Sequence, residues 1–143
     1  MSEEEAAAAV RALVLKVNEA EQVTVQTGDF TELQRLSTPD RLAEEHRELP
    51  VYIRGELMQK GEIVFDRFQT LAVEAVSPTS AKVTAQFCAD VSGAYVVDTA
   101  TGKNLTSPDR ANRQSLKVTA EFGEGISKLS PYSSFEEGNA CSE

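Results

Sequence analysis

The hydrophobic pattern of this chain changes its period at about Gly61. Before that point Val10, Leu13, Val14 and Val17 recur at i, i+3, i+4 and i+7, the spacing of one buried stripe on an α-helix. After it, β-branched and aromatic residues alternate with polar ones, which is typical of half-buried strands. The chain is therefore expected to begin with helices and to continue as a sheet.

The first helix is expected to start at Ser2 and to end before Gly28. Ser2 supplies a capping hydroxyl, and the glutamates that follow it lie near the positive end of the helix dipole. A short helical turn is expected next, with Phe30, Leu33 and Leu36 pointing inward.

A further helix is predicted to open at Thr38 and Pro39. Threonine caps helices, and proline suits the first helical position because its missing N–H needs no partner there. Leu42, His46 and Leu49 are expected to share the buried face of this helix.

Pro50 is expected to break the helical part, because proline cannot donate the hydrogen bond of a helix interior. A second helical stretch is then predicted over residues 51–59, with Gly61 as its stop. Strands are predicted over residues 63–76, 81–90, 94–98, 113–122 and 126–130.

These elements predict one α+β domain, in which N-terminal helices pack on one face of a curved antiparallel sheet. The expected parts are a helical part over residues 1–60, a sheet over residues 61–131 and a polar tail over residues 132–143.

Two cysteines occupy very different places in this scheme. Cys88 lies on the otherwise polar face of a predicted strand, and Cys141 lies in the tail. A disulfide between them would pin the tail to the sheet and would place the protein in an oxidising compartment. The alternative is two free thiols in a cytoplasmic protein.

Composition excludes several classes of function. The net charge of −9 and the absence of clustered Lys and Arg argue against a nucleic-acid partner. No apolar run is long enough to span a bilayer, and the acidic start of the chain is unlike an export signal. An export segment or lipid anchor ahead of Met1 would reconcile this start with a disulfide.

The sheet region resembles the nuclear transport factor 2-like superfamily, and within it the small secreted proteins and lipoproteins of actinobacteria. The residues that carry this resemblance are CADVS at 88–92, VVD at 96–98, TGK at 101–103, Arg113 and Cys141. The resemblance implies helices packed as a cone against a strongly curved antiparallel sheet. It also implies export, and it brings no activity with it.

Enzymes of this superfamily, such as those similar to ketosteroid isomerase, place a tyrosine and aspartates in the cone. Tyr52, Asp66 and Tyr95 have the corresponding chemistry here and are candidate catalytic residues. The alternative for Asp66 is a surface contact with Arg67 or Lys82.

His46 is the only histidine, so a histidine-dependent nucleophile or metal site would have to include it. The alternative is a partly buried histidine with a satisfied hydrogen bond. The spacings of Cys and His do not match a metal site, and no motif for a nucleophile or a phosphate loop occurs. No cofactor and no metal are expected.

Three functions remain. The first is a non-enzymatic secreted or cell-envelope module that binds a protein partner or a small apolar ligand. The second is an isomerase- or dehydratase-like enzyme that acts on a hydrophobic molecule in the cone, and the third is a structural homodimer. A deep cavity that holds Asp66 and a tyrosine hydroxyl would favour the enzyme.

Overall fold

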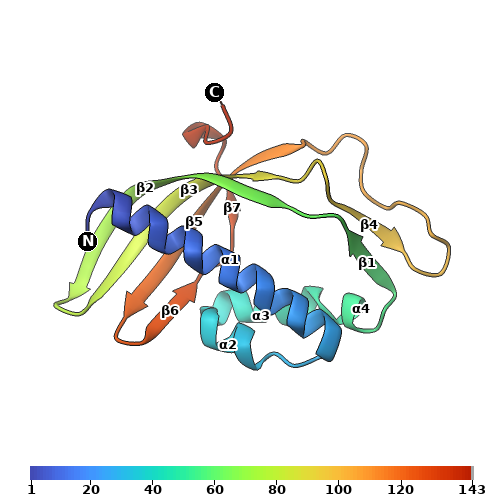
Figure 1. The fold of residues 1–143 in the computed structure, drawn as a ribbon, viewed down its shortest axis with the longest axis horizontal. Helices are drawn as coiled ribbons and strands as arrows, with labels where there is room; N and C mark the ends of the chain where they lie inside the picture. The colour runs from blue at the N-terminus through green and yellow to red at the C-terminus, as the bar shows by residue number, and fades with distance from the viewer. Residues whose placement is uncertain (143) are drawn as a thin grey trace.

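The protein has an α+β architecture in which helices cover one face of a mainly antiparallel sheet (Figure 1). The computed structural model describes residues 1–142. Its helices are α1 (Glu3–Thr27), α2 (Thr31–Leu36), α3 (Pro39–Glu48) and α4 (Pro50–Ile53), with a 3₁₀ turn, η1 (Glu136–Gly138), near the C-terminus.

Helix α1 starts and ends where the local sequence predicts. The backbone N–H of Glu5 donates to the Ser2 hydroxyl, and the Glu5 carboxylate accepts in return from the Ser2 N–H, so the pair forms a capping box. Gly28 ends the helix in the left-handed conformation, which glycine adopts without steric cost. The predicted stripe is confirmed, since Val10, Val14 and Val17 are fully buried.

The strands form two sheets. β2, β3, β5 and β6 follow one another in the larger sheet, and β7 pairs with β5, whereas β1 and β4 pair only with each other. Their bounds are Leu57–Lys60 for β1, Val64–Ser77 for β2, Ser80–Asp90 for β3, Tyr95–Asp98 for β4, Arg113–Gly123 for β5, Ile126–Leu129 for β6 and Ser133–Ser134 for β7.

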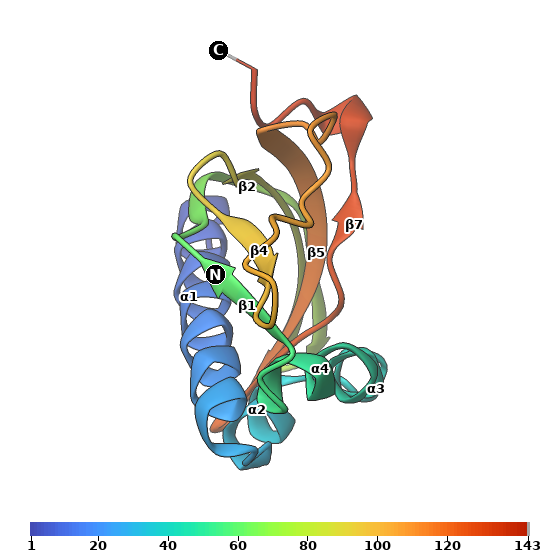
Figure 2. The same cartoon turned by 90° about the vertical axis from the view of Figure 1, so that its right-hand side faces the viewer.

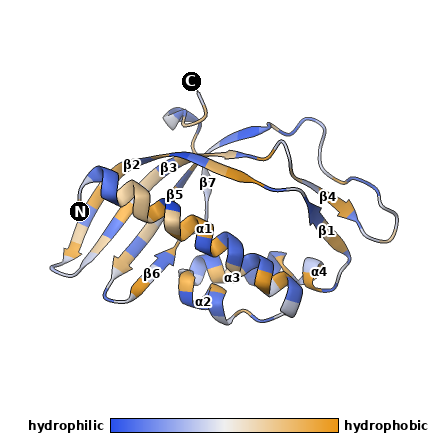
Figure 3. Cartoon of the chain, viewed as in Figure 1, coloured by the Kyte–Doolittle hydropathy of each residue, from blue (hydrophilic) through white to orange (hydrophobic). Residues whose placement is uncertain are grey.

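The register of β3 and β5 separates an apolar face from a polar face. Phe87 lies opposite Leu116 on the face that meets α1, and Cys88 lies opposite Ser115 on the other face. Figure 2 shows α1 along one face of the larger sheet, which contains β5 and its neighbour β7. Hydrophobic and hydrophilic segments both occur along the strands near α1 (Figure 3). The predicted alternation of apolar and polar residues along β3 is confirmed.

The predicted helical stretch over residues 51–59 is confirmed only for residues 51–53 and is wrong beyond them. Helix α4 ends at Ile53, and Gly55 turns the chain with a φ of 77°. Residues Leu57–Lys60 then form β1, because they pair with Tyr95–Asp98 of β4, a partner that lies far along the sequence. The helical part therefore ends at Ile53, seven residues before the predicted boundary at residue 60.

The predicted disulfide is confirmed, since Cys88 and Cys141 are bonded to each other. Cys88 is fully buried under the C-terminal segment, although it belongs to the polar face of β3. The backbone N–H of Ala140 donates to the Ser115 hydroxyl at 3.0 Å, which adds a second attachment beside the disulfide. Within residues 1–142, no helix is long and apolar enough to cross a membrane.

Candidate functional site: a cavity between the helices and the sheet

A cavity of about 720 Å³ lies between the C-terminal half of α1, the helices α3 and α4, and strand ends of both sheets. Its volume falls in the range of small-molecule sites. The sheet side and its surroundings supply most of its apolar lining: Val25, Leu49, Leu57, Met58, Ile63, Phe65, Ala89, Val91, Leu116 and Pro131. The helix side carries most of the charged lining, namely Glu21, Arg41, Glu44, Glu45 and Glu48, so the two sides of the cavity differ in chemical character.

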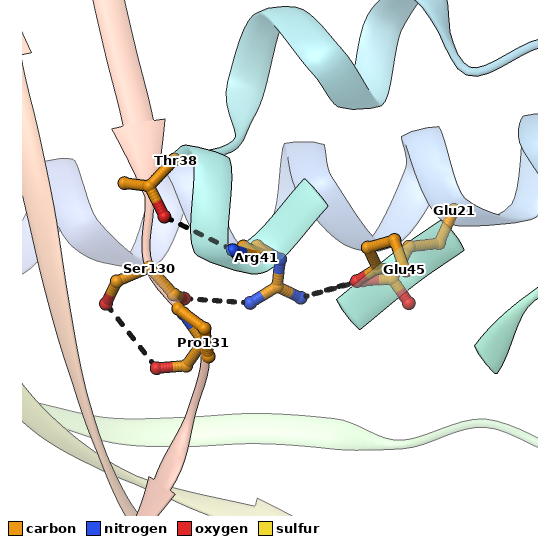
Figure 4. A network of polar contacts seen from close by, with 6 residues as sticks. All are labelled: Glu21, Thr38, Arg41, Glu45, Ser130 and Pro131. Atoms are coloured by element: carbon orange, nitrogen blue, oxygen red, sulfur yellow. Dashed lines mark hydrogen bonds and ion pairs between the residues drawn. The ribbon is translucent and has the colours of Figure 1, made fainter. Parts of the chain in front are cut away.

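Arg41 is the centre of the polar wall, and it is only 5% exposed. Its Nη2 donates to Glu21 Oε1 at 2.9 Å and lies 3.3 Å from Glu45 Oε1. Its Nη1 donates to the carbonyl oxygen of Ser130 at 3.0 Å (Figure 4). One guanidinium thus joins α1, α3 and the segment that follows β6.

The chain positions Arg41 by fixing the start of α3. The Thr38 hydroxyl accepts from the backbone N–H of Arg41 at 3.4 Å, and the N–H of Thr38 itself donates to the carbonyl of Leu129 at 3.1 Å. The end of β6 therefore holds the first turn of the helix that carries Arg41.

Tyr132 completes this wall. The Arg41 guanidinium lies 4.5 Å from the centroid of the Tyr132 ring, a cation–π geometry. The Tyr132 ring also meets Phe87 of the core in an edge contact, with 5.2 Å between the ring centroids. Tyr132 thus links the charged cluster to the hydrophobic core.

Glu21 and Glu45 share the single guanidinium of Arg41, and both of their pKa values are shifted in this cluster. Burial, followed by the charge of Glu21, raises the pKa of Glu45 to about 7 even though Arg41 lowers it. Burial also raises the pKa of Glu21, against the opposing effect of Arg41. Burial likewise raises the pKa of Tyr132 above its ordinary value. The cluster therefore holds a carboxyl group that changes its charge near neutral pH.

Replacing Glu45 with glutamine is expected to weaken the pH dependence of stability between about pH 5 and pH 8. The pKa of Glu45 rises from 4.5 to about 7 on folding, so the folded state keeps a proton that the unfolded state has lost. The free energy of unfolding must then fall as the pH rises through this range, and glutamine removes that contribution. Urea unfolding of the variant and of the unmodified protein at about pH 5 and pH 8 measures how much the free energy of unfolding of each changes with pH.

Glu19→Gln is the matched control, because Glu19 is exposed on α1 and lies outside the cavity lining. Several charged groups face Glu45: Glu21 of α1, and Arg41, Glu44 and Glu48 of α3. An equal decline of stability with pH in the Glu45→Gln variant and in the unmodified protein would contradict the prediction.

The structure does not bring Tyr52, Asp66 and Tyr95 together. Tyr52 lines the cavity, and burial together with the charge of Glu48 raises the pKa of its phenol. Tyr95 is 39% exposed on β4 and is outside the cavity lining.

Asp66 has a partner that the sequence did not indicate. It lies opposite Cys88, on the polar side of the sheet, and its carboxylate is 3.9 Å from Arg113. Asp66 pairs with Cys88 of β3, and Arg113 pairs with Asp90, which lies two residues further along β3. Asp66 and Arg113 therefore lie diagonally across this strand, and the Arg113 contact takes the place of the expected one with Arg67 or Lys82.

The predicted buried face of α3 is confirmed for Leu49, which is buried in the core, but it is wrong for His46. His46 is exposed and stacks on Phe30, with 4.1 Å between the ring centroids. Arg41 and Glu45 are buried instead, because both face the carboxylate of Glu21. Within residues 1–142, no three His, Cys, Asp or Glu side chains are grouped as metal ligands would be.

Comparison with known proteins supports the fold. The structure is similar to the crystal structure of the intermembrane space region of chloroplast protein ARC6, with a TM-score of 0.62 and 13% sequence identity. The match covers 90% of this chain and 95% of that one. No protein-family model and no curated protein matches the chain. At this identity the likeness concerns the fold alone.

Proposed function

We propose that this protein is a non-enzymatic binding module that holds a small, mainly apolar ligand in the cavity between its helices and its sheet. The observation that carries this proposal is the cavity of about 720 Å³, with an apolar wall of sheet residues opposite a polar wall built on Arg41. Sites of this kind bind small molecules through apolar contact and orient them with a few polar groups.

Two further properties belong to this proposal. Membership of the nuclear transport factor 2-like superfamily is supported by the order of helices and antiparallel strands and by register shifts between β2 and β3, since bulges bend the strands that carry them. A secreted or cell-envelope location is supported by the disulfide. Alkylation of thiols in intact cells before lysis tests the location, and labelled Cys88 and Cys141 would contradict it.

Filling the cavity is expected to abolish binding of a neutral apolar dye. Ala89 lines the cavity and is buried, so that the ring of an Ala89→Phe variant would occupy ligand space. Affinity for N-phenyl-1-naphthylamine, measured by its fluorescence, should fall at least about tenfold. Ala100→Phe is the matched control, because Ala100 is exposed in the turn after β4.

Gln114→Phe provides a second filling variant with less risk to folding, since Gln114 lines the cavity and is only half-buried. Circular dichroism confirms that each variant is folded. Unchanged dye affinity in both filling variants, or no dye binding by the unmodified protein, would overturn the proposal.

Proton transfer in the same cavity is a second candidate function. Glu45 supports it, because a carboxyl group with a pKa of about 7 in a partly apolar site is suited to act as a general acid or base. Isomerisation of a β,γ-unsaturated ketone tests this function. Turnover that disappears in Glu45→Gln and persists in Glu19→Gln would favour it over binding alone.

A further inference from the structure

The charges around the cavity are strongly unequal. Among the described residues that line it, Arg41 is the single basic side chain. The acidic side chains of the lining are Glu21, Glu44, Glu45, Glu48 and Glu62. An anionic ligand would therefore enter a site that repels it, whereas a cation would be attracted.

Arg41 does not correct this imbalance. Its two terminal nitrogens already contact Glu21, Glu45 and the carbonyl of Ser130, and the face of its guanidinium lies over Tyr132. Its Nε has no hydrogen-bond partner, but it is buried. The guanidinium is thus committed to the wall of the cavity and is not free to pair with a ligand anion.

The cluster therefore has one more negative charge than positive charge when both carboxylates are ionised. Glu45 is 7% exposed, and two carboxylates there share one guanidinium. An excess of buried negative charge is costly, and either a proton or an external cation removes this cost. Glu44 and Glu48, on the same helix and also in the lining, add to the attraction for a cation.

The opposite wall is apolar and contains Ile63, Phe65 and Leu116. A ligand that satisfies both walls carries a positive group at one end and a hydrocarbon body at the other. We propose that the ligand of this cavity is a cationic amphiphile, whose ammonium group pairs with Glu45 and Glu48 and whose apolar body packs on the sheet wall. This inference rests on the proposed binding function and adds the chemical class of the ligand.

Three ten-carbon probes that differ only in the head group test this inference: decylammonium, decanol and decanoate. Each displaces N-phenyl-1-naphthylamine from the protein at about pH 8, where the carboxyl group of Glu45 is mainly ionised. Decylammonium is expected to bind at least about tenfold more tightly than decanol, as charge-assisted contacts do, and decanoate is expected to be the weakest.

Variants test whether the preference for decylammonium comes from the carboxylates of the cavity or from the net negative charge of the whole protein. Glu45→Gln and, independently, Glu48→Gln should reduce the preference for decylammonium over decanol, while Glu19→Gln should retain it. Glu48 is exposed, so its replacement leaves the fold intact. The Ala89→Phe variant keeps every surface charge and should lose the binding of decylammonium together with that of decanol.

The outcomes distinguish the two proposals. Equal affinities for the three probes, or tightest binding of decanoate, would overturn the cationic ligand and leave the binding function standing. A preference for decylammonium that survives both Glu45→Gln and Glu48→Gln would also overturn it. Failure of all three probes to displace the dye would contradict the binding function as well.

Discussion

Replacing Arg41 with methionine is expected to lower the free energy of unfolding by about 3–5 kcal/mol at pH 8, the usual cost of removing one partner from a buried ion pair. Methionine keeps much of the apolar stem of arginine, so the loss reports mainly the missing charge and its hydrogen bonds. Glu21 and Glu45 would then face each other without the guanidinium, and the carbonyl of Ser130 would lose its donor.

The loss of stability in Arg41→Met is expected to depend on pH. Arg41 lowers the pKa values of both Glu21 and Glu45, so its removal must raise them further. The variant should therefore lose less stability at about pH 5, where the carboxyl groups take up protons, than at pH 8. Urea unfolding of both proteins at the two pH values gives the comparison.

Arg35→Met is the matched control. Arg35 forms an ion pair with Glu32 on α2, and both side chains are more than half exposed. Exposed pairs of this kind contribute at most about 1 kcal/mol, so this variant should stay close to the unmodified protein. An Arg41→Met loss that matches that of Arg35→Met, or that is the same at pH 5 and pH 8, would contradict a charge-based role for Arg41.

Elements that depend on neighbouring residues could be predicted from the sequence. The start of α1 follows from Ser2 and Glu5, and its buried stripe follows from the spacing of its valines. The apolar and polar faces of β3 follow from simple alternation, which also places Cys88 on the face where Cys141 reaches it. These signals are local, so they hold wherever the element lies in the fold.

Elements that depend on distant partners could not be predicted in this way. β1 exists because it pairs with β4, and its sequence, LMQK, has no strand pattern of its own. The Arg41 cluster joins Glu21, 20 positions away, and Ser130, 89 positions away. In the sequence alone Arg41 and Glu45 form an i, i+4 pair, which is typical of a solvated helix face, so no local signal marks them as buried.

Removing the disulfide is expected to lower the free energy of unfolding by about 4 kcal/mol, because Cys88 and Cys141 close a long loop in the unfolded chain. The two residues are 53 positions apart. The Cys88→Ala/Cys141→Ala double variant, unfolded in urea beside the unmodified protein, measures this effect. Addition of a reductant is the matched control: it should destabilise the unmodified protein and leave the double variant unchanged. Equal stability of the two proteins without reductant would contradict the prediction.

The same variant tests whether the tail and the cavity are independent. Cys88 and Ser115 point to the tail side of the sheet, whereas Ala89 and Leu116, their neighbours in sequence, line the cavity on the other side. Alternation along a strand thus separates the two sites by the thickness of one sheet. The double variant should lose hydrogen-exchange protection at Ala140, whose N–H donates to Ser115, and should still bind N-phenyl-1-naphthylamine with unchanged affinity while it is folded. A loss of dye affinity in step with the loss of protection at Ala140 would instead show that the tail holds the cavity in shape.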